Sequence, residues 1–409
     1  MDLAETLNRT VKLAMDEGRA SSYEEAHRLF NSFRLKVAVA PGFTKSPAGE
    51  AAVLTLLNAA RKTFLGGVEL VGPWDEVCTM AWFKGQSLLE VATTFGIDCE
   101  RGTADAPTIM VGAVAPAQPP DFCVGMHLRA AGFTLEPGCG SSWDADAGAE
   151  AGVAAAGAAM NEAFQHVYRR WSLAGQRVIR FAFAPGLPMP APDTEWVVGL
   201  GHLGQAYLWT RALAAAGSAS RIRLTDFDVV SLSSLSTCLL VDLADIDDKK
   251  VDAVAAKLAR VGFDVVRDRA RLSLEEDVIA PDGSVAVIAV DNIGLRRGLD
   301  RLRGARILES GIGEGIDGFT RVQVHKFPGS RLARDVWAGE DVRASRHVDI
   351  SKPAYRALLD ESGDECGTTM VASRSVATPF VGAFAGAVLA HMIGKEPLGD
   401  AWNFDLNCL

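Results

Sequence analysis

A glycine-rich turn and the acidic strand end that follows it are the residues of this chain whose spacing best fits a chemical task. The turn has the sequence GLGHLG, with glycines at Gly199, Gly201 and Gly204. It follows an apolar run and precedes a stretch that is typical of a helix. Glycines so placed allow a tight strand-to-helix turn, let backbone approach a phosphate and let the helix pack closely on the strand. The next apolar run ends in Asp226, where a carboxylate can hold a ribose hydroxyl. The pattern predicts a nucleotide-binding βαβ unit.

Two charged residues after this unit extend the predicted site. Asp228 adds a second carboxylate to the same strand end, and Lys250 stands near the start of a predicted helix. A lysine there can direct its ammonium at phosphates, although the usual place of a lysine is a solvated surface. The apolar face of that helix is Val251, Val254, Ala255 and Leu258.

Polar residues also follow the buried run at 285–290, at the carboxyl end of a predicted strand. Open α/β sheets bind ligands at that edge, so Asp291 and Asn292 are candidate site residues. Asp291 could hold Mg²⁺ beside a triphosphate, or it could simply cap the helix that follows. Arg296 lies five residues further on and could face the same site.

The composition excludes several classes of partner. The 409 residues carry 41 Lys and Arg against 51 Asp and Glu, a net charge of −10, and no basic run stands out. Nucleic acid and anionic membrane surfaces are therefore unexpected partners. The N-terminus has no apolar core of a signal peptide and indicates a polar helix, so we expect a cytoplasmic protein. The apolar segment at 376–393 contains Pro379 and His391, and we expect a buried helix there instead of a membrane span.

The cysteines predict neither a disulfide framework nor a zinc site. Their number is odd, they are scattered, and no CxxC pair occurs, which suits a reducing compartment. They are Cys78, Cys99, Cys123, Cys139, Cys238, Cys366 and Cys408.

The sequence predicts two halves joined by a proline-rich segment at 183–194. Similar elements recur in the same order on each side of this segment. The matched pairs are Lys36–Val39 with Trp196–Val198, Ala51–Phe64 with Leu203–Ala215, Gly67–Val71 with Ile222–Thr225, Ala106–Ala113 with Val285–Asn292, Leu128–Gly138 with Leu302–Gly311, and Ala151–Val167 with Ala377–Ile393. Alternating strands and helices predict an α/β fold of two Rossmann-like, doubly wound parallel sheets in tandem, a pseudodimer of residues 1–187 and 188–409. Two unrelated α/β domains would be the alternative.

The halves differ at the place where a nucleotide would bind. The first half has PGFTKSPAGE at 41–50 in place of the glycine turn, and VGPWD at 71–75 in place of the acidic strand end. It therefore lacks a phosphate cradle, and we expect a scaffold in the first half and the working site in the second.

The second half resembles the ThiF/MoeB/E1-like adenylyltransferase superfamily. The resemblance rests on GLGHLG, TDFDVVSLSSL, the lysine of DKK, VDNxxxR, ESGIGEGIDG at 309–318 and the final CG…PFVGAFAGAVLA block, in family order. Members use ATP to activate the C-terminal carboxylate of a ubiquitin-like protein, and in ubiquitin-activating enzymes an inactive adenylation domain pairs with an active one. The resemblance implies that Gly199, Gly201, Gly204 and Asp226 hold adenosine and phosphates, Lys250 stabilises phosphate charge and Asp291 holds Mg²⁺. One chain could be a complete pseudodimeric monomer, or two could form a homodimer.

The resemblance also raises the question of a thiol. In such enzymes the acyl group of the acyl-adenylate can be transferred to a cysteine, which forms a thioester. Cys366 is the leading candidate, since shorter activating enzymes carry a thiol on a crossover loop in this region, but it could equally correspond to a zinc cysteine of the family. Its acidic neighbours would also raise a thiol pKa. Cys238, beside the predicted nucleotide site, is the rival, or it is a small buried hydrophobe.

One family motif is altered. Where the family has Asn-Leu-x-Arg-Gln, this chain has Ser-Leu-Ser-Thr-Cys at 234–238, so Thr237 replaces a phosphate-facing arginine. An arginine from the first half could substitute, and Arg9, Arg28 and Arg34 are the candidates. Without a substitute, a non-catalytic E1-like scaffold or peptide-recognition protein is the alternative function. An NAD(P)-dependent oxidoreductase would use the same glycine turn, but nothing after Asp226 resembles a hydride-transfer site.

Overall fold

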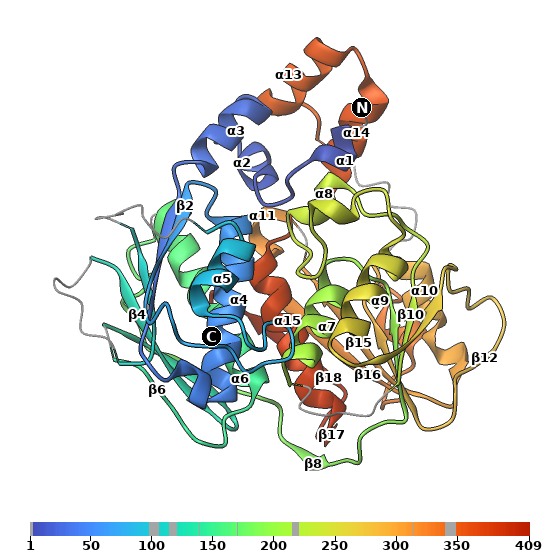
Figure 1. Cartoon of the computed structure of the whole chain (residues 1–409). Helices are drawn as coiled ribbons and strands as arrows, with labels where there is room; N and C mark the ends of the chain where they lie inside the picture. Colours follow the sequence, from blue (N-terminus) through green and yellow to red (C-terminus); the bar gives the residue numbers. More distant parts are fainter. Residues whose placement is uncertain are drawn as a thin grey trace.

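The computed structural model describes residues 3–97, 106–113, 121–138, 140–169, 171–214, 221–313, 315–339 and 349–409. Two seven-stranded sheets, one from each half, face each other across a layer of helices (Figure 1). Cys99, Cys139 and Ala215 lie outside the described residues.

The first sheet is parallel over four strands and antiparallel at one edge. Its order is β2 (Gly67–Val71), β1 (Arg34–Val39), β3 (Thr108–Val111), β4 (Cys123–Arg129), β5 (Gly132–Pro137) and β7 (Ile179–Ala182), with β6 (Ser142–Trp143) paired to β4. The pairings of β5 with β4 and of β7 with β5 are antiparallel.

The second sheet repeats this plan with one additional edge strand. Its order is β11 (Asp264–Asp268), β10 (Arg221–Thr225), β9 (Thr194–Val198), β13 (Ser284–Ile288), β15 (Arg306–Ile312), β16 (Arg321–Phe327) and β18 (Ala401–Asp405). The strands are parallel as far as β15, and the pairings of β16 with β15 and of β18 with β16 are antiparallel. Two short ribbons lie outside these sheets, β12 (Val278–Ile279) with β14 (Leu302–Arg303) and β8 (Gly186–Pro188) with β17 (Lys395–Pro397).

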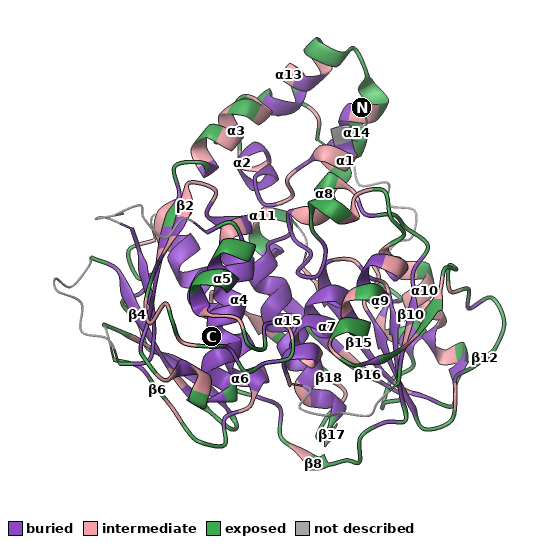
Figure 2. Cartoon of the chain, viewed as in Figure 1, coloured by how far each residue is buried: buried purple, intermediate pink, exposed green. Residues whose placement is uncertain are grey.

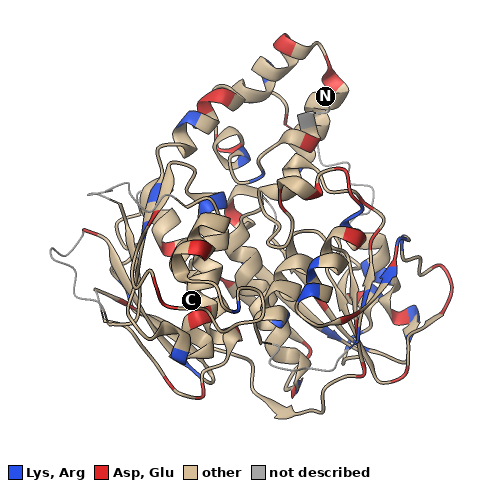
Figure 3. Ribbon diagram, in the orientation of Figure 1, with Lys and Arg blue, Asp and Glu red and all other residues tan. Residues whose placement is uncertain are grey.

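Four helices between the sheets form the shared core. They are α4 (Pro47–Thr63), α6 (Ala149–Phe164), α7 (His202–Ala214) and α15 (Pro379–Ile393), and they are buried almost throughout (Figure 2). Small residues let them approach closely: a Cβ at Gly157 of α6 would lie 2.6 Å from the carbonyl oxygen of Phe380 in α15. Few charged residues lie on these central helices (Figure 3). The predicted buried helix near the C-terminus is therefore confirmed, and none of the helices in the described ranges is both long and apolar enough for a membrane span.

The tandem α/β prediction is confirmed, with one correction to the matching of the halves. β1, α4 and β2 occupy the places of β9, α7 and β10, and α6 that of α15. Leu128–Gly138, however, does not correspond to Leu302–Gly311. It crosses the hairpin between β4 and β5, and the sheet order makes β4 the counterpart of β15 and β5 that of β16. The apolar pattern alone does not reveal where an antiparallel strand turns back.

A small cap of helices lies above the sheets and joins the N-terminal helices to two helices of the second half (Figure 1). It consists of α1 (Leu3–Thr6), α2 (Lys12–Asp16), α3 (Tyr23–Phe30), α13 (Pro353–Ser362) and α14 (Glu365–Ser373). Glu5 pairs with Arg374 at 2.6 Å, and the hydroxyl of Tyr355 donates a hydrogen bond to the carboxylate of Asp16.

The remaining helices are short or lie at the edge of a sheet. They are α5 (Leu88–Thr94), α8 (Leu232–Leu235), α9 (Lys250–Arg260), α10 (Ile293–Arg297), α11 (Gly315–Gly318) and α12 (Ala333–Val336). The residues predicted to form the apolar face of α9 are all buried.

Candidate active site

The glycine turn between β9 and α7 has the geometry that its sequence predicts. Gly199 has a φ of +89°, and a Cβ there would lie 2.5 Å from the carbonyl oxygen of Ala289. A Cβ at Gly204 would lie 1.9 Å from the carbonyl oxygen of Gly199, so the helix packs on the turn at a distance that only glycine permits. At Gly201 no atom lies within 4 Å of the added carbon, and the backbone is open to a ligand.

Asp226 connects this turn to the acidic strand end. Its Oδ2 accepts a hydrogen bond of 2.6 Å from the backbone N–H of Leu200, and its Oδ1 one of 2.8 Å from that of Asp228. Asp226 is buried, whereas the side chain of Asp228 is 48% exposed. Asp226 thus shapes the turn, while Asp228 presents its carboxylate to solvent.

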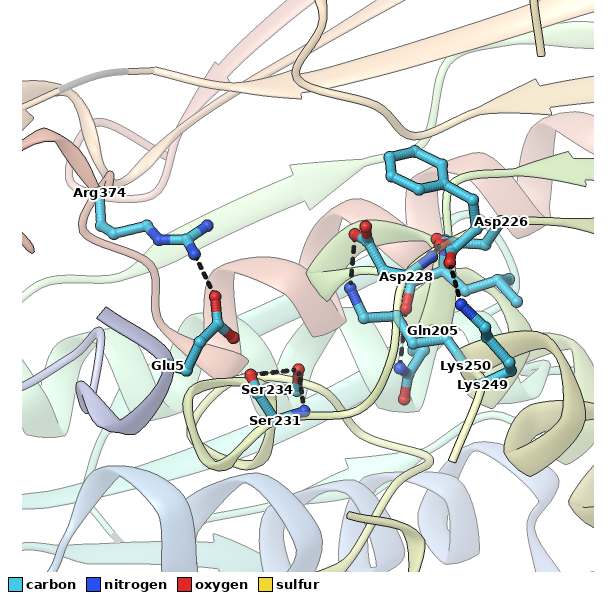
Figure 4. Close-up of polar contacts among 11 residues, drawn as sticks. Glu5, Gln205, Asp226, Asp228, Ser231, Ser234, Lys249, Lys250 and Arg374 are labelled. Atoms are coloured by element: carbon cyan, nitrogen blue, oxygen red, sulfur yellow. Dashed lines mark hydrogen bonds and ion pairs between the residues drawn. The ribbon is translucent and has the colours of Figure 1, made fainter. Parts of the chain in front are cut away.

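Lys250, the first residue of α9, faces both carboxylates. Its Nζ lies 3.0 Å from Oδ2 of Asp228, and its neighbour Lys249 donates to the carbonyl oxygen of Phe227 (Figure 4). Burial alone would lower the pKa of Lys250, but the negative charges of Asp226 and Asp228 and the hydrogen bond to Asp228 outweigh burial and raise that pKa. The ammonium is therefore held in its charged form beside the glycine turn.

Gln205 is a residue of this site that the sequence pattern did not single out. Its Nε2 donates to the carbonyl oxygen of Leu200 at 2.8 Å, and its Oε1 accepts from the N–H of Leu240 at 3.0 Å. It therefore ties the glycine turn to the segment after α8. The sequence could have indicated Gln205, because it directly follows GLGHLG and therefore lies in the first turn of α7.

Asp291 and Asn292 stand at the carboxyl end of β13, at the same edge as the glycine turn. Asn292, not Asp291, caps the following helix, accepting a hydrogen bond of 2.9 Å from the N–H of Leu295. Asp291 is exposed and makes no hydrogen bond or ion pair with another described residue. An open carboxylate of this kind suits Mg²⁺, which takes one or two protein carboxylates together with phosphate oxygens. Within the described residues, no group of three or more His, Cys, Asp or Glu could hold a metal on its own.

Arg296 lies on α10 as the sequence predicts, but its guanidinium is occupied by the protein. Its Nε lies 2.9 Å from the carbonyl oxygen of Val290 and 3.1 Å from Oε1 of the buried Glu309. A Cβ at Gly311 would lie 2.9 Å from this guanidinium. Arg296 thus holds the strand end that precedes Asp291.

Arg9, on the N-terminal segment, is the first-half arginine that reaches the second-half site. Its backbone N–H donates to Oγ of Ser236 at 3.2 Å, and its Nε donates to the carbonyl oxygen of Ser375 at 3.0 Å. Burial lowers the pKa of Arg9, and Cys238 and Asp291 act against that shift without outweighing it. The other two candidates, Arg28 and Arg34, are exposed on α3 and β1.

The two candidate thiols have opposite environments. Cys366 is exposed in the first turn of α14, a helix and not a loop, whose N-cap Asp364 accepts a hydrogen bond of 2.8 Å from the N–H of Gly367. Cys238 is buried, and burial raises its pKa although Lys250, Lys62 and Arg9 act to lower it. Of the two, Cys366 is the accessible thiol.

In the first half an internal carboxylate fills the place of the phosphate cradle. Glu76 accepts hydrogen bonds from the N–H of Gly42 at 2.7 Å, the N–H of Thr44 at 3.0 Å and the hydroxyl of Thr44 at 2.6 Å. These donors belong to the turn between β1 and α4, the counterpart of the glycine turn. The first half thus satisfies its own anion-binding turn.

Family models match both halves. The model of the BilD N-terminal domain matches residues 34–182, and that of the BilD C-terminal domain matches residues 191–397. The bacterial E1-like protein BilD of Collimonas sp. (strain OK412) is 32% identical over 423 residues, covering 98% of this chain and 90% of that protein. The chain belongs to the BilD family of bacterial E1-like proteins. The resemblance to the ThiF/MoeB/E1-like superfamily is thereby confirmed.

More distant relatives of this BilD family chain cover only part of it. The molybdopterin-synthase adenylyltransferase of Haemophilus influenzae (strain ATCC 51907 / DSM 11121 / KW20 / Rd) is 33% identical over 108 residues, which is 26% of this chain and 43% of that enzyme. The solved structure of Escherichia coli MccB is 14% identical, with a TM-score of 0.35, over 52% of this chain and 59% of its own. That of PaaA has 20% identity and a TM-score of 0.26, over 32% and 40%.

Proposed function

We propose that this chain is an ATP-dependent adenylyltransferase that activates the C-terminal carboxylate of a ubiquitin-like protein, or of a small carrier protein or peptide. The observation that carries the proposal is the convergence of Lys250, Asp228 and the open Asp291 on one strand edge, with Arg9 entering from the other half. Membership of the BilD family and the named activity of the Haemophilus relative support it. In this proposal residues 1–187 form the inactive half and residues 188–409 the working half of a pseudodimeric monomer.

The chemistry that this arrangement suits is substitution at the α-phosphorus of ATP. A carboxylate oxygen of the substrate forms a bond to that phosphorus, the bond to the bridging oxygen breaks, and pyrophosphate leaves with the negative charge. No proton moves, because the attacking carboxyl group is already ionised. Lys250 and Arg9 supply the fixed positive charge that the transferring group needs.

Some of these residues would bind the nucleotide or Mg²⁺, and others hold those residues in place. Backbone N–H groups at Gly201 and the start of α7 would bind the phosphates, and the exposed Asp228 would hold the ribose, while the buried Asp226 shapes the turn between them. Asp291 would hold Mg²⁺, which neutralises phosphate charge when bound. Asn292 and Arg296 hold the strand end on which Asp291 stands.

Thioester formation would be a second step on Cys366. Its sulfur, as the thiolate, bonds to the acyl carbon of the adenylate, AMP leaves, and the thiol proton goes to solvent. Cys366 is exposed on α14, and Ser375, whose carbonyl oxygen accepts a hydrogen bond from Arg9, lies two residues beyond the end of that helix.

A non-catalytic scaffold is the second candidate, favoured by Thr237 at the place of the family arginine. The two functions are separated by ATP–pyrophosphate exchange in the presence of a ubiquitin-like protein with a free C-terminus. Exchange that disappears when this C-terminus is amidated supports adenylation. Binding of the tail without any exchange would support the scaffold instead.

A further inference from the structure

A lysine of the first half lies under the altered motif of the second half. Lys62, near the end of α4, donates from Nζ to the carbonyl oxygens of Leu235 at 3.0 Å and Cys238 at 2.6 Å. These acceptors are 173 and 176 positions away in the chain, and Lys62 is only 7% exposed. The contact is a buried bridge between the two halves.

A second side chain of α4 binds the same segment. Asn58 stands one helical turn before Lys62, on the same face of the helix, and its Nδ2 donates to the carbonyl oxygen of Leu239 at 2.8 Å. Together Asn58 and Lys62 bind three carbonyl oxygens of residues 235–239, which we call the anchored loop.

The anchored loop is also in contact with the candidate site. Oγ of Ser236 accepts a hydrogen bond from the backbone N–H of Arg9, and Lys250 and Arg9 both act to lower the pKa of Cys238, which burial raises. Directly after the loop, the N–H of Leu240 donates to Gln205. A displacement of the loop would therefore change the positions of the groups that face the phosphates.

The ammonium of Lys62 is costly to bury at this place. Its hydrogen-bond acceptors are carbonyl oxygens and not a carboxylate, so the charge is solvated but not neutralised. Burial and the neighbouring charges of Arg61 and Lys257 lower the pKa of Lys62 to about 7, against the opposing effect of Cys238 and Asp242. An apolar side chain of similar length would avoid this cost, so stability alone does not account for a lysine here.

We propose that Lys62, assisted by Asn58, is a positioning residue of the nucleotide site. It holds the anchored loop in the position that lets Arg9 and Lys250 contact the phosphates. The inference rests on the proposed function. It assigns to the inactive half a direct part in the chemistry of the other half, beyond the burial of a shared core.

The test compares nucleotide affinities of the full chain and its variants by calorimetry. The probes are Mg-ATP, Mg-ADP and AMP, and the variants are Lys62→Met and Asn58→Ala. Lys36→Met is the matched control, because Lys36 lies on β1 of the same half and pairs with Glu69 at 3.5 Å, away from the anchored loop. For Lys62→Met we expect the Kd of Mg-ATP to rise about tenfold. The loss of affinity relative to the wild type should be smaller for Mg-ADP and smallest for AMP, which carries the fewest phosphates. Asn58→Ala should lose less nucleotide affinity, again most for Mg-ATP and least for AMP. Lys36→Met should keep the wild-type affinity for all three nucleotides.

The outcomes are distinguishable. If the wild-type chain does not bind Mg-ATP, the proposed function fails, and this inference with it. If the wild type binds while Lys62→Met binds equally well, or loses ATP and AMP affinity alike, only the positioning role is overturned. Thermal melts of each variant separate a loss of fold from a loss of phosphate affinity, and if Lys62→Met does not fold, Asn58→Ala decides by the same criterion.

Discussion

Lys250 Nζ lies 3.0 Å from Oδ2 of Asp228, and this ion pair joins the start of α9 to the acidic end of β10. The pair joins a largely buried cation to a half-exposed carboxylate at the sheet edge that also carries the glycine turn. A nucleotide bound there would receive its phosphates at the cation and its ribose at the carboxylate.

Replacing Lys250 should weaken the binding of Mg-ATP. Lys250→Met removes the ammonium but keeps the length of the chain, and we expect a loss of about tenfold or more, as for a charge-assisted contact to phosphate. Lys257→Met is the control: it removes a lysine from the same helix that pairs with Asp242 and Asp245. Calorimetry with Mg-ATP measures both, and equal affinities in the two variants would argue against the assigned role of Lys250.

Arg9 should affect the rate of adenylation more than Arg28 does. Arg9→Met removes the cation that reaches the site from the N-terminal segment, and we expect exchange of pyrophosphate into ATP to slow by roughly 100-fold, a usual effect of losing one preorganised charge. Arg28→Met removes an exposed arginine of α3 and should leave the rate unchanged. A wild-type rate in Arg9→Met would mean that another group replaces the arginine missing at Thr237.

Cys366 should carry the thioester if one forms. With ATP and a ubiquitin-like protein, the wild type should give an adduct that dithiothreitol removes, and Cys366→Ser should lose it while pyrophosphate exchange continues. Cys408→Ser is the matched control, since Cys408 is also exposed. Gel electrophoresis with and without reductant reads the adduct, and its persistence in Cys366→Ser would place the thiol elsewhere.

The lowered pKa of Lys62 predicts how stability depends on pH. The folded chain releases this proton at about pH 7, whereas an ordinary lysine releases it at 10.5. Between these values the unfolded chain binds the additional proton, so the contribution of Lys62 to the free energy of unfolding increases as pH rises and is lost as pH falls toward 7. Urea denaturation at about pH 7 and about pH 10 should therefore show the wild type gaining stability relative to Lys62→Met. A constant difference between the two proteins would contradict the shift.

Much of this arrangement could be predicted because local signals determine it. The glycine turn, the acidic strand end and the carboxyl end of β13 each depend on backbone rules that act within a few residues. The order of elements in the two halves follows from the same periodicity. These rules located Asp226, Asp228 and Asp291 at one edge of a sheet.

Other features depend on packing between residues that are far apart in the chain. The bridge from Lys62 to Cys238 joins two halves, and neither residue has a neighbour in sequence that indicates the other. The sequence could name Arg9, Arg28 and Arg34 as alternatives but could not choose among them, because the choice depends on where the N-terminal segment lies. The sequence predicts that Arg296 faces the nucleotide site, but its contact with Glu309 depends on the pairing of β13 with β15, which no local pattern indicates.

Calorimetric titration of the wild-type chain with Mg-ATP, and separately with NAD, would show whether the second half is a single adenylating site. We expect one Mg-ATP site per chain, because Glu76 occupies the counterpart turn of the first half. We also expect that Asp291→Ala abolishes the dependence of ATP binding on Mg²⁺, and that NAD does not bind. Binding of NAD without ATP, or two ATP sites per chain, would contradict the assignment of the second half as the single adenylating site.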